Sequence, residues 1–217
     1  MNILFLDLGS STGCIACVQE DSVASMQTIG HRTSDETLLP AIEETLKEAG
    51  WQWSDLTHSA CVIGPGGFMS LRVAVAFANT IVHRLKIPGT GVHLSDLYCA
   101  RVNSQKSIVQ SCLWLHSTKK TQLFIRGFGE FEKHWPEPVQ ISLEEIANPS
   151  TALRTGRQSQ FANSVWIGEL LPEHAAVLSE MGIEPAPLQS LEEVLPQFLA
   201  KKTYDSSLLE PWYGREG

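Results

Sequence analysis

The chain lacks the features that mark membrane, secreted or nucleic-acid-binding proteins. Its 217 residues hold 16 lysines and arginines against 24 aspartates and glutamates, a net charge of −8. A protein that is the main contact of a nucleic acid needs a basic face, so this charge argues against that role. No apolar run is long enough to span a bilayer, and the first residues lack the basic segment of a signal peptide. We therefore expect a cytoplasmic protein without membrane contact.

Cysteine and paired histidines are also scarce. The five cysteines follow no repeating pattern, which indicates reduced thiols rather than a disulfide framework. Cys14 and Cys17 stand three apart on an expected strand, so they point to opposite faces of it. The seven histidines are scattered and offer no pair at metal-binding spacing. The sequence predicts no metal site and argues against a metallopeptidase.

The first hundred residues have the pattern of a mixed α/β domain. Three short strands are followed by helix, strand, helix, strand and helix, an order typical of a mixed sheet with helices packed on it. A capping-box pattern, Thr33-x-x-Glu36, opens the first helix. The expected elements are strands at 3–8, 13–18, 22–28, 59–63 and 90–93, and helices at 33–50, 68–85 and 95–102.

A polar segment after residue 102 is the expected domain boundary. We assign residues 1–102 to an N-terminal domain and 103–217 to a smaller C-terminal α/β domain, whose tail is expected to return to the first. No internal sequence repeat is visible. The expected second-domain elements are strands at 107–116, 120–127 and 164–167, a hairpin turn at 117–119, and helices at 173–181 and 191–199.

The run from Gly64 to Arg72 joins a strand to a long helix through a glycine- and proline-rich turn. Glycine reaches positive φ without steric cost, and proline fixes one φ angle. Backbone N–H groups at such a helix start can hold an anion. The Gly-Lys-Ser/Thr signature of a Walker phosphate loop is missing, and a plain strand-to-helix turn remains the simpler interpretation.

The helix that follows is apolar on more than one side. One stripe runs from Phe68 through Leu71 and Val75 to Leu85, and a second includes Met69, Val73 and Phe77. A surface helix of a monomer shows one apolar stripe, whereas a helix that is apolar all round is covered on both sides. The pattern predicts that one stripe packs on the sheet and the other on a second protein chain.

The segment from Asp7 to Thr12 is typical of the first hairpin turn of an actin-like or sugar-kinase-like domain. In such domains, backbone N–H and hydroxyl groups bind a phosphate and the aspartate binds magnesium. An enzyme of that class needs a second phosphate loop and an adenosine loop, and the sequence offers neither. An ATP-dependent phosphotransferase using Asp7, Gly9 and Ser10 is therefore the alternative hypothesis, and a vestigial phosphate loop is the favoured one.

With these motifs the chain resembles the TsaB family, also called YeaZ. Members begin with Ile-Leu-x-Ile-Asp-Thr, carry His-x-x-x-Leu-Leu-Pro and Gly-Pro-Gly-Ser-Phe-Thr-Gly-Leu-Arg, and close with Glu-Pro-x-Tyr-Leu-Arg. The corresponding residues here lie at 3–8, 34–40, 64–72 and 210–215. Gly67, Met69 and Ser70 replace the family's Ser, Thr and Gly, and Ser34 stands where His is usual. The match covers residues 1–100 and the C-terminus.

The resemblance implies an actin-like ATPase (ribonuclease-H-like) superfamily fold of two small α/β domains with mixed sheets. It implies a pseudoenzyme without catalytic residues or cofactor, which scaffolds the TsaD-type threonylcarbamoyltransferase in tRNA threonylcarbamoyladenosine modification. The implied partners are TsaD as a heterodimer, the ATPase TsaE, a second copy of the chain when isolated, and tRNA only through the complex. The expected partner interface comprises Leu38, Leu39, Ile42, Phe68, Leu71, Arg72, Val75, Ala78 and Val82.

Overall fold

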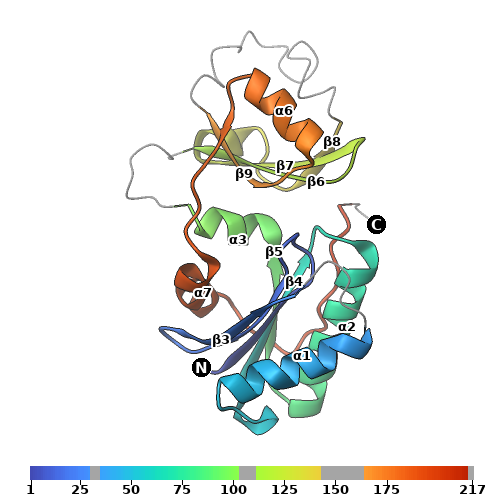
Figure 1. Ribbon diagram of the computed structural model, residues 1–217, viewed down its shortest axis with the longest axis vertical. Helices are drawn as coiled ribbons and strands as arrows, with labels where there is room; N and C mark the ends of the chain where they lie inside the picture. Colours follow the sequence, from blue (N-terminus) through green and yellow to red (C-terminus); the bar gives the residue numbers. More distant parts are fainter. Residues whose placement is uncertain (30–34, 103–110, 143–163, 215–217) are drawn as a thin grey trace. The chain divides into compact units, whose positions relative to one another are not determined.

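A computed structural model describes residues 1–29, 35–102, 111–142 and 164–214, and these form two units (Figure 1). The first unit contains Met1–Leu97 and the C-terminal segment from Ser190 onward, and the second contains Tyr98–Gln189. The sequence placed this boundary at residue 102 and assigned the helix at 191–199 to the second domain, with the tail returning to the first. The structure differs there, because that helix also packs with the first unit. Thr33 and Ser34 lie outside the described residues.

The first unit contains a five-stranded sheet in the order β3-β2-β1-β4-β5. Strands β1, β2 and β3 form an antiparallel meander, whereas β1, β4 and β5 run parallel. The carboxyl ends of these three parallel strands therefore meet at one edge of the sheet. The strands are β1 (Ile3–Asp7), β2 (Cys14–Val18), β3 (Val23–Thr28), β4 (His58–Gly64) and β5 (Gly89–His93).

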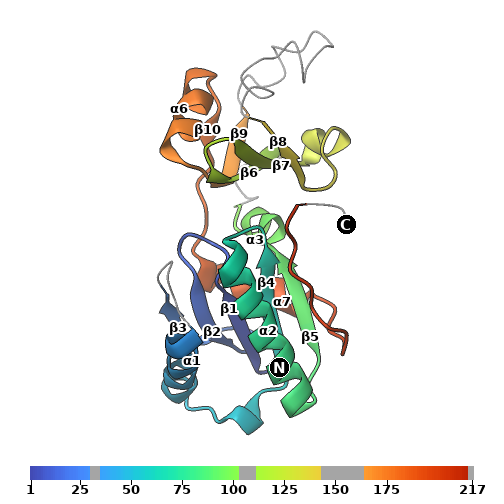
Figure 2. The same ribbon diagram turned by 90° about the vertical axis from the view of Figure 1, so that its right-hand side faces the viewer.

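Helices cover both faces of this sheet (Figures 1 and 2). Helices α1 (Asp35–Glu48) and α2 (Phe68–Leu85) lie on one face, and α3 (Leu94–Ala100) and α7 (Leu191–Ala200) lie on the other. Because side chains alternate along a strand, Leu4 and Leu6 of β1 enter the core under α1 and α2 while Phe5 points to the opposite side. The short 3-10 helix η1 (Trp53–Asp55) follows α1.

The second unit contains another five-stranded sheet, in the order β10-β9-β6-β7-β8. Its apolar core combines alternate residues of β6 and β7 with Leu178 of α6. Among the described residues this core holds fewer buried side chains than that of the first unit, and its helix α6 has nine residues. The elements are β6 (Cys112–Lys119), β7 (Gln122–Phe128), η2 (Gly129–Lys133), β8 (Val139–Ile141), β9 (Val165–Glu169), α6 (Pro172–Glu180) and β10 (Glu184–Pro185).

The two sheets have the same topology, although the sequence shows no repeat. In each, an antiparallel three-strand meander continues into two strands parallel to its first strand. Strands β6 to β10 correspond in order to β1 to β5, α6 corresponds to α2, and α7 corresponds to α3. The repetition is one of backbone connectivity alone, since each unit fills its core with different side chains.

Most elements lie where the sequence predicts them, and α2 has the predicted bounds. The turn predicted at residues 117–119 is wrong, because β6 continues to Lys119 and the chain reverses at Lys120–Thr121. Strands β8 and β10 were not predicted. Within the described residues, none of the helices has the length and apolar character needed to cross a membrane.

Candidate functional site

The Asp7 loop (residues 7–13) joins β1 to β2 at the edge where the parallel strands end. Asp7 is buried, with 2% of its surface exposed. Its Oδ1 accepts hydrogen bonds from the backbone N–H groups of Gly9 (2.9 Å) and Ser10 (3.0 Å), and its Oδ2 accepts one from the Ser10 hydroxyl (2.6 Å). The two backbone N–H groups that would face a phosphate are thus bonded to the chain's own carboxylate. Asp7, Gly9 and Ser10 lie together in a loop whose hydrogen bonds are made to its own carboxylate.

The turn before α2 packs directly on this loop. A Cβ added to Gly66 would lie 2.6 Å from the Gly9 Cα and 2.7 Å from the Gly9 carbonyl oxygen. A Cβ added to Gly9 would in turn meet Leu71 at 3.1 Å and the Pro65 carbonyl at 3.2 Å. Since real Cβ atoms almost never approach backbone below 3.0 Å, Gly66 depends on glycine, whereas a side chain at Gly9 would require its neighbours to move by a few tenths of an ångström. The space above the Asp7 loop is therefore filled by the Gly64–Pro65–Gly66 turn.

The C-terminal segment covers the same edge beside β4 and β5. The backbone N–H of Trp212 donates to the Ile63 carbonyl (2.8 Å), and its indole meets the His93 ring edge-on with centroids 4.6 Å apart. Gly64 has a positive φ of 149°, and a Cβ there would collide with the Trp212 carbonyl oxygen. Sequence reasoning predicted that the tail returns to the first domain but missed this contact, which joins residues about 150 positions apart.

Most of the apolar side chains predicted to meet a partner are buried within this chain. The long stripe of α2 packs on the sheet, and the inner face of α1 joins the same core. A side chain that its own chain already covers has no surface left to bury against a partner. The interface prediction is therefore wrong for the buried residues Leu38, Ile42, Leu71, Val75, Ala78 and Val82.

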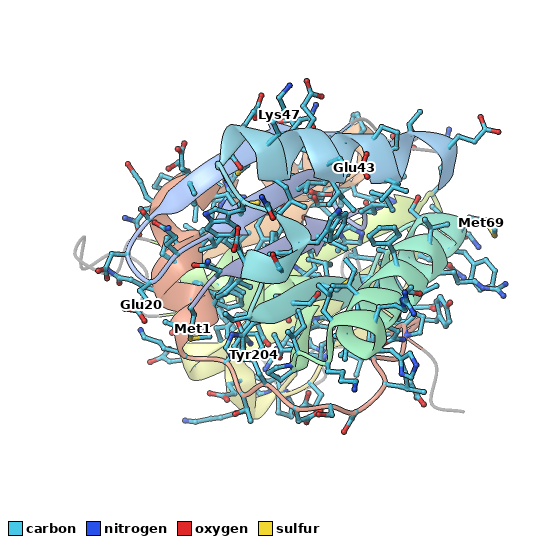
Figure 3. The ribbon with its side chains drawn as sticks, turned by 90° about the horizontal axis from the view of Figure 1, so that it is seen from below. Met1, Glu20, Glu43, Lys47, Met69 and Tyr204 are labelled. Atoms are coloured by element: carbon cyan, nitrogen blue, oxygen red, sulfur yellow. The ribbon has the colours of Figure 1, made fainter. Side chains whose placement is uncertain are left out.

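The remaining three predicted interface residues are exposed. Phe68 and Leu39 expose 57% and 43% of their surface, and Arg72 is also exposed. Met69, beside Phe68, exposes 64% and points away from the body at the end of the helix (Figure 3). We call Phe68, Met69 and Arg72 the α2 tip. The Arg72 guanidinium lies 5.3 Å from the Phe68 ring centroid. The positive charge and the aromatic ring therefore form one continuous surface patch.

A second group of polar side chains lies in the second unit, where β6 and β9 end. The Tyr98 hydroxyl donates to Glu169 (2.7 Å), and His116 Nδ1 lies 4.0 Å from the other Glu169 oxygen. Burial lowers the pKa of His116, while the nearby Glu169 carboxylate acts in the opposite direction. The His116 ring, 2% exposed, stacks on Trp114. His116 and Tyr98 are buried, and Glu169 keeps 14% of its side-chain surface exposed.

The described residues contain no cluster of three or more side chains suited to hold a metal ion. None of the five cysteines, all of which lie in the described residues, forms a disulfide, and four of them are buried. Burial raises the pKa of Cys17 to about 11 and of Cys112 to about 12. A buried protonated thiol is neither a nucleophile nor a metal ligand, so these cysteines contribute packing.

The fold and the Asp7 loop define the class of this protein. Two mixed five-stranded sheets of identical topology, with a first strand that ends in Asp7, form the actin-like ATPase fold of the ribonuclease-H-like superfamily. The YeaZ structure from Pseudomonas aeruginosa has this fold, with a TM-score of 0.69, 18% identity, and coverage of 98% of this chain and 99% of that one. The predicted fold class is confirmed.

The model of the TsaD family, tRNA N6-adenosine threonylcarbamoyltransferase, matches residues 21–163, more than half of the chain, and the chain belongs to this family. TsaB of Haemophilus influenzae is 22% identical over 239 residues, covering 99% of this chain and 94% of that protein. TsaB of Buchnera aphidicola is 26% identical over 55% of each chain. The predicted TsaB/YeaZ membership is confirmed.

The transferase itself is also a relative. The tRNA N6-adenosine threonylcarbamoyltransferase of Syntrophus aciditrophicus is 28% identical over 106 residues, which cover 48% of this chain and 31% of that protein. The chain thus spans about a third of this curated relative and about half of the Buchnera protein.

Proposed function

We propose that this chain is a non-catalytic scaffold subunit that binds and supports a TsaD-type transferase in tRNA threonylcarbamoyladenosine biosynthesis. The observation that carries the proposal is the internal packing of the Asp7 loop. Asp7 bonds the loop's own N–H groups, and Gly66 fills the space above Gly9. A loop closed in this way supports a structural role over phosphate chemistry, and the TsaB relatives supply the pathway.

The family relationship supports a partner that resembles this chain. Because both TsaB and TsaD proteins are relatives, two similar first units can meet through like surfaces, as the subunits of a pseudo-symmetric dimer do. The α2 tip is the best candidate surface, since it combines an exposed aromatic ring, a methionine and an arginine. These residue types are enriched at the centre of protein interfaces.

The other partners follow from the same role. A TsaE-type ATPase would join the assembled pair, and tRNA would be contacted through the complex because the net charge of −8 is unfavourable for direct binding. The α2 tip is also available for pairing with a second copy when the chain is isolated. The assembly would act in the cytoplasm, where tRNA is modified, and this subunit would need no cofactor.

Titration calorimetry with the TsaD-type protein of the same host tests the proposal. We expect the wild-type chain to bind, and Met69→Glu and Arg72→Glu to weaken binding by about tenfold or more, because each change places a negative charge at the interface centre. Lys133→Glu is the matched control, since it makes the same charge reversal on η2 of the second unit. Unchanged affinity in both α2 variants would contradict this surface.

Titration with magnesium-ATP tests the phosphotransferase alternative. The scaffold hypothesis predicts no saturable binding to the isolated chain, since the Asp7 loop is bonded to itself. Micromolar binding that is abolished by Asp7→Asn would favour the phosphotransferase alternative and contradict the scaffold proposal.

A further inference from the structure

The last described residues of the chain run beside α2 without regular secondary structure. We call residues 208–214 the tail. The Asn79 side chain bonds both backbone groups of Leu209: its Nδ2 donates to the Leu209 carbonyl (3.0 Å), and its Oδ1 accepts from the Leu209 N–H (2.9 Å). One asparagine thereby fixes the tail to the middle of α2. The Leu209 side chain also packs against the core beneath α1 and α2.

A second attachment lies three residues further on, at Trp212. Its N–H bonds the Ile63 carbonyl, its ring meets His93, and its carbonyl uses the room left by the missing side chain of Gly64. Four residues of extended chain span roughly 13 Å, and the eleven helical residues from Asn79 back to Phe68 span roughly 16 Å. The tail therefore runs antiparallel to α2 and reaches the α2 tip.

At that end, Tyr213 joins the patch of the α2 tip. The Tyr213 and Phe68 rings lie 5.0 Å apart at an angle of 37°, and the Arg72 guanidinium covers Phe68. Arg72, Phe68 and Tyr213 thus form a continuous row drawn from two parts of the chain that are 141 to 145 positions apart. Tyr213 exposes 37% of its surface and Phe68 exposes 57%, so both rings keep an accessible face.

We propose that the tail is part of the partner-binding surface, and that Tyr213 contacts the same TsaD-type partner as the α2 tip. The proposal rests on the proposed function. The partner must present a carboxylate to Arg72, because no acidic side chain among the described residues forms an ion pair with that guanidinium. It must also present an apolar surface to the two rings. Trp212 acts as the positioning residue that holds Tyr213 in place.

Calorimetry on the full chain and its TsaD-type partner tests the tail. We expect Tyr213→Ala to raise the Kd by about fivefold or more, with only a small change in melting temperature, because the ring contact of Tyr213 is with Phe68, which is itself 57% exposed. We expect Trp212→Ala to raise the Kd similarly but also to lower the melting temperature, since it releases the tail from His93. A rise smaller than about fivefold for Tyr213→Ala overturns the proposal.

Photo-crosslinking gives a readout that does not depend on the stability of a variant. A photo-reactive phenylalanine derivative at position 213 should form a covalent adduct with the partner. The same group at Glu20, at the opposite end of the sheet where it contacts the N-terminus, should form none. A wild-type chain that fails to bind the partner contradicts the proposed function. Binding by the wild type without an adduct at position 213 contradicts the tail alone.

Discussion

The two units repeat one topology but stabilise their hairpin turns in different ways. In the first, the Asp7 carboxylate bonds its own loop, and the glycine turn before α2 packs on it backbone to backbone. In the second, side chains reach across instead: the Leu171 N–H donates to Ser117 (2.8 Å), and His174 Nε2 donates to the Lys120 carbonyl (2.9 Å). In both units the turn between strand and helix supports the hairpin. It does so by close backbone packing in the first unit and by hydrogen bonds in the second.

The corresponding helices differ as much as the turns. Helix α2 has 18 residues and buries six side chains, whereas α6 has nine and buries two. Because α2 is longer, it anchors one stripe on the sheet and still presents an exposed tip. The comparison teaches that connectivity fixes where the helix starts, while its length and first residues decide whether it can offer a surface to another protein.

The largest effect is expected from a charge in the buried stripe of α2. Val75→Glu places a carboxylate among Leu and Ile side chains, so it should unfold the first unit with a loss of about 3 kcal/mol or more. Denaturant unfolding followed by circular dichroism measures this. A folded Val75→Glu protein that merely loses its partner would restore the sequence-based assignment of Val75 to the interface.

Gly66→Ala should rank next, because its Cβ would collide with the Gly9 backbone, which cannot move aside like a side chain. We expect a loss of about 2 kcal/mol or more of unfolding free energy. Gly67→Ala is the matched control: its Cβ meets only Ser70, at 3.4 Å, so it should cost less than about 1 kcal/mol. Equal melting temperatures for the two variants would show that the turn and the Asp7 loop are not tightly packed.

Asp7→Asn should have a smaller effect. The amide keeps one acceptor oxygen for the backbone N–H groups but loses the charge-assisted bond with the Ser10 hydroxyl. We expect a loss of about 1–3 kcal/mol, measured by thermal unfolding at constant pH. A more stable variant would indicate that the carboxylate is strained in place for ligand binding, and would contradict a purely structural loop.

The smallest effect is a pH dependence in the second unit. Burial lowers the pKa of His116 below its ordinary value of 6.5, so below that pH the unfolded chain binds a proton that the folded chain does not. Stability should therefore fall as pH drops below about 6.5, by at most about 1.4 kcal/mol per pH unit, until the folded-state pKa is reached.

His116→Phe provides the comparison for this prediction, since it keeps a ring beside Trp114 without a titrating group. We expect the stability of the variant to depend less on pH between about pH 5 and 7, because His116 no longer titrates. Some slope should remain, since His58, whose pKa burial also lowers, still contributes in the first unit. An identical slope in both proteins would assign the whole effect to groups other than His116.

Local patterns made much of this fold predictable. The apolar periodicity of α2 extends over five turns without a breaker, so both of its ends were assigned correctly. The β6–β7 turn was misplaced because residues 117–119 are polar and resemble a turn, although they are the end of a strand paired with Gln122. Strands β8 and β10 are too short to show a pattern, at three and two residues.

The candidate site was predictable in its parts but not in its packing. The sequence identified Asp7, Gly9, Ser10 and the glycine turn as separate motifs, and could not reveal that Gly66 sits on Gly9. It likewise found two apolar stripes on α2 without showing that Leu71 and Val75 face the chain's own sheet. To decide whether a side chain is buried or exposed, one must know which way it points relative to strands far away in the sequence. The periodicity of the sequence does not give that direction.

The sequence by itself determined the order of the longer strands and helices, the apolar character of α2, and the motifs that relate the chain to TsaB. These features depend on residues close together along the chain, whose steric and hydrophobic preferences act locally. Only the tertiary structure decided which α2 residues remain exposed and that Tyr213 lies against Phe68. Those contacts join residues more than a hundred positions apart, and they form only when the folded sheet brings the tail alongside the helix.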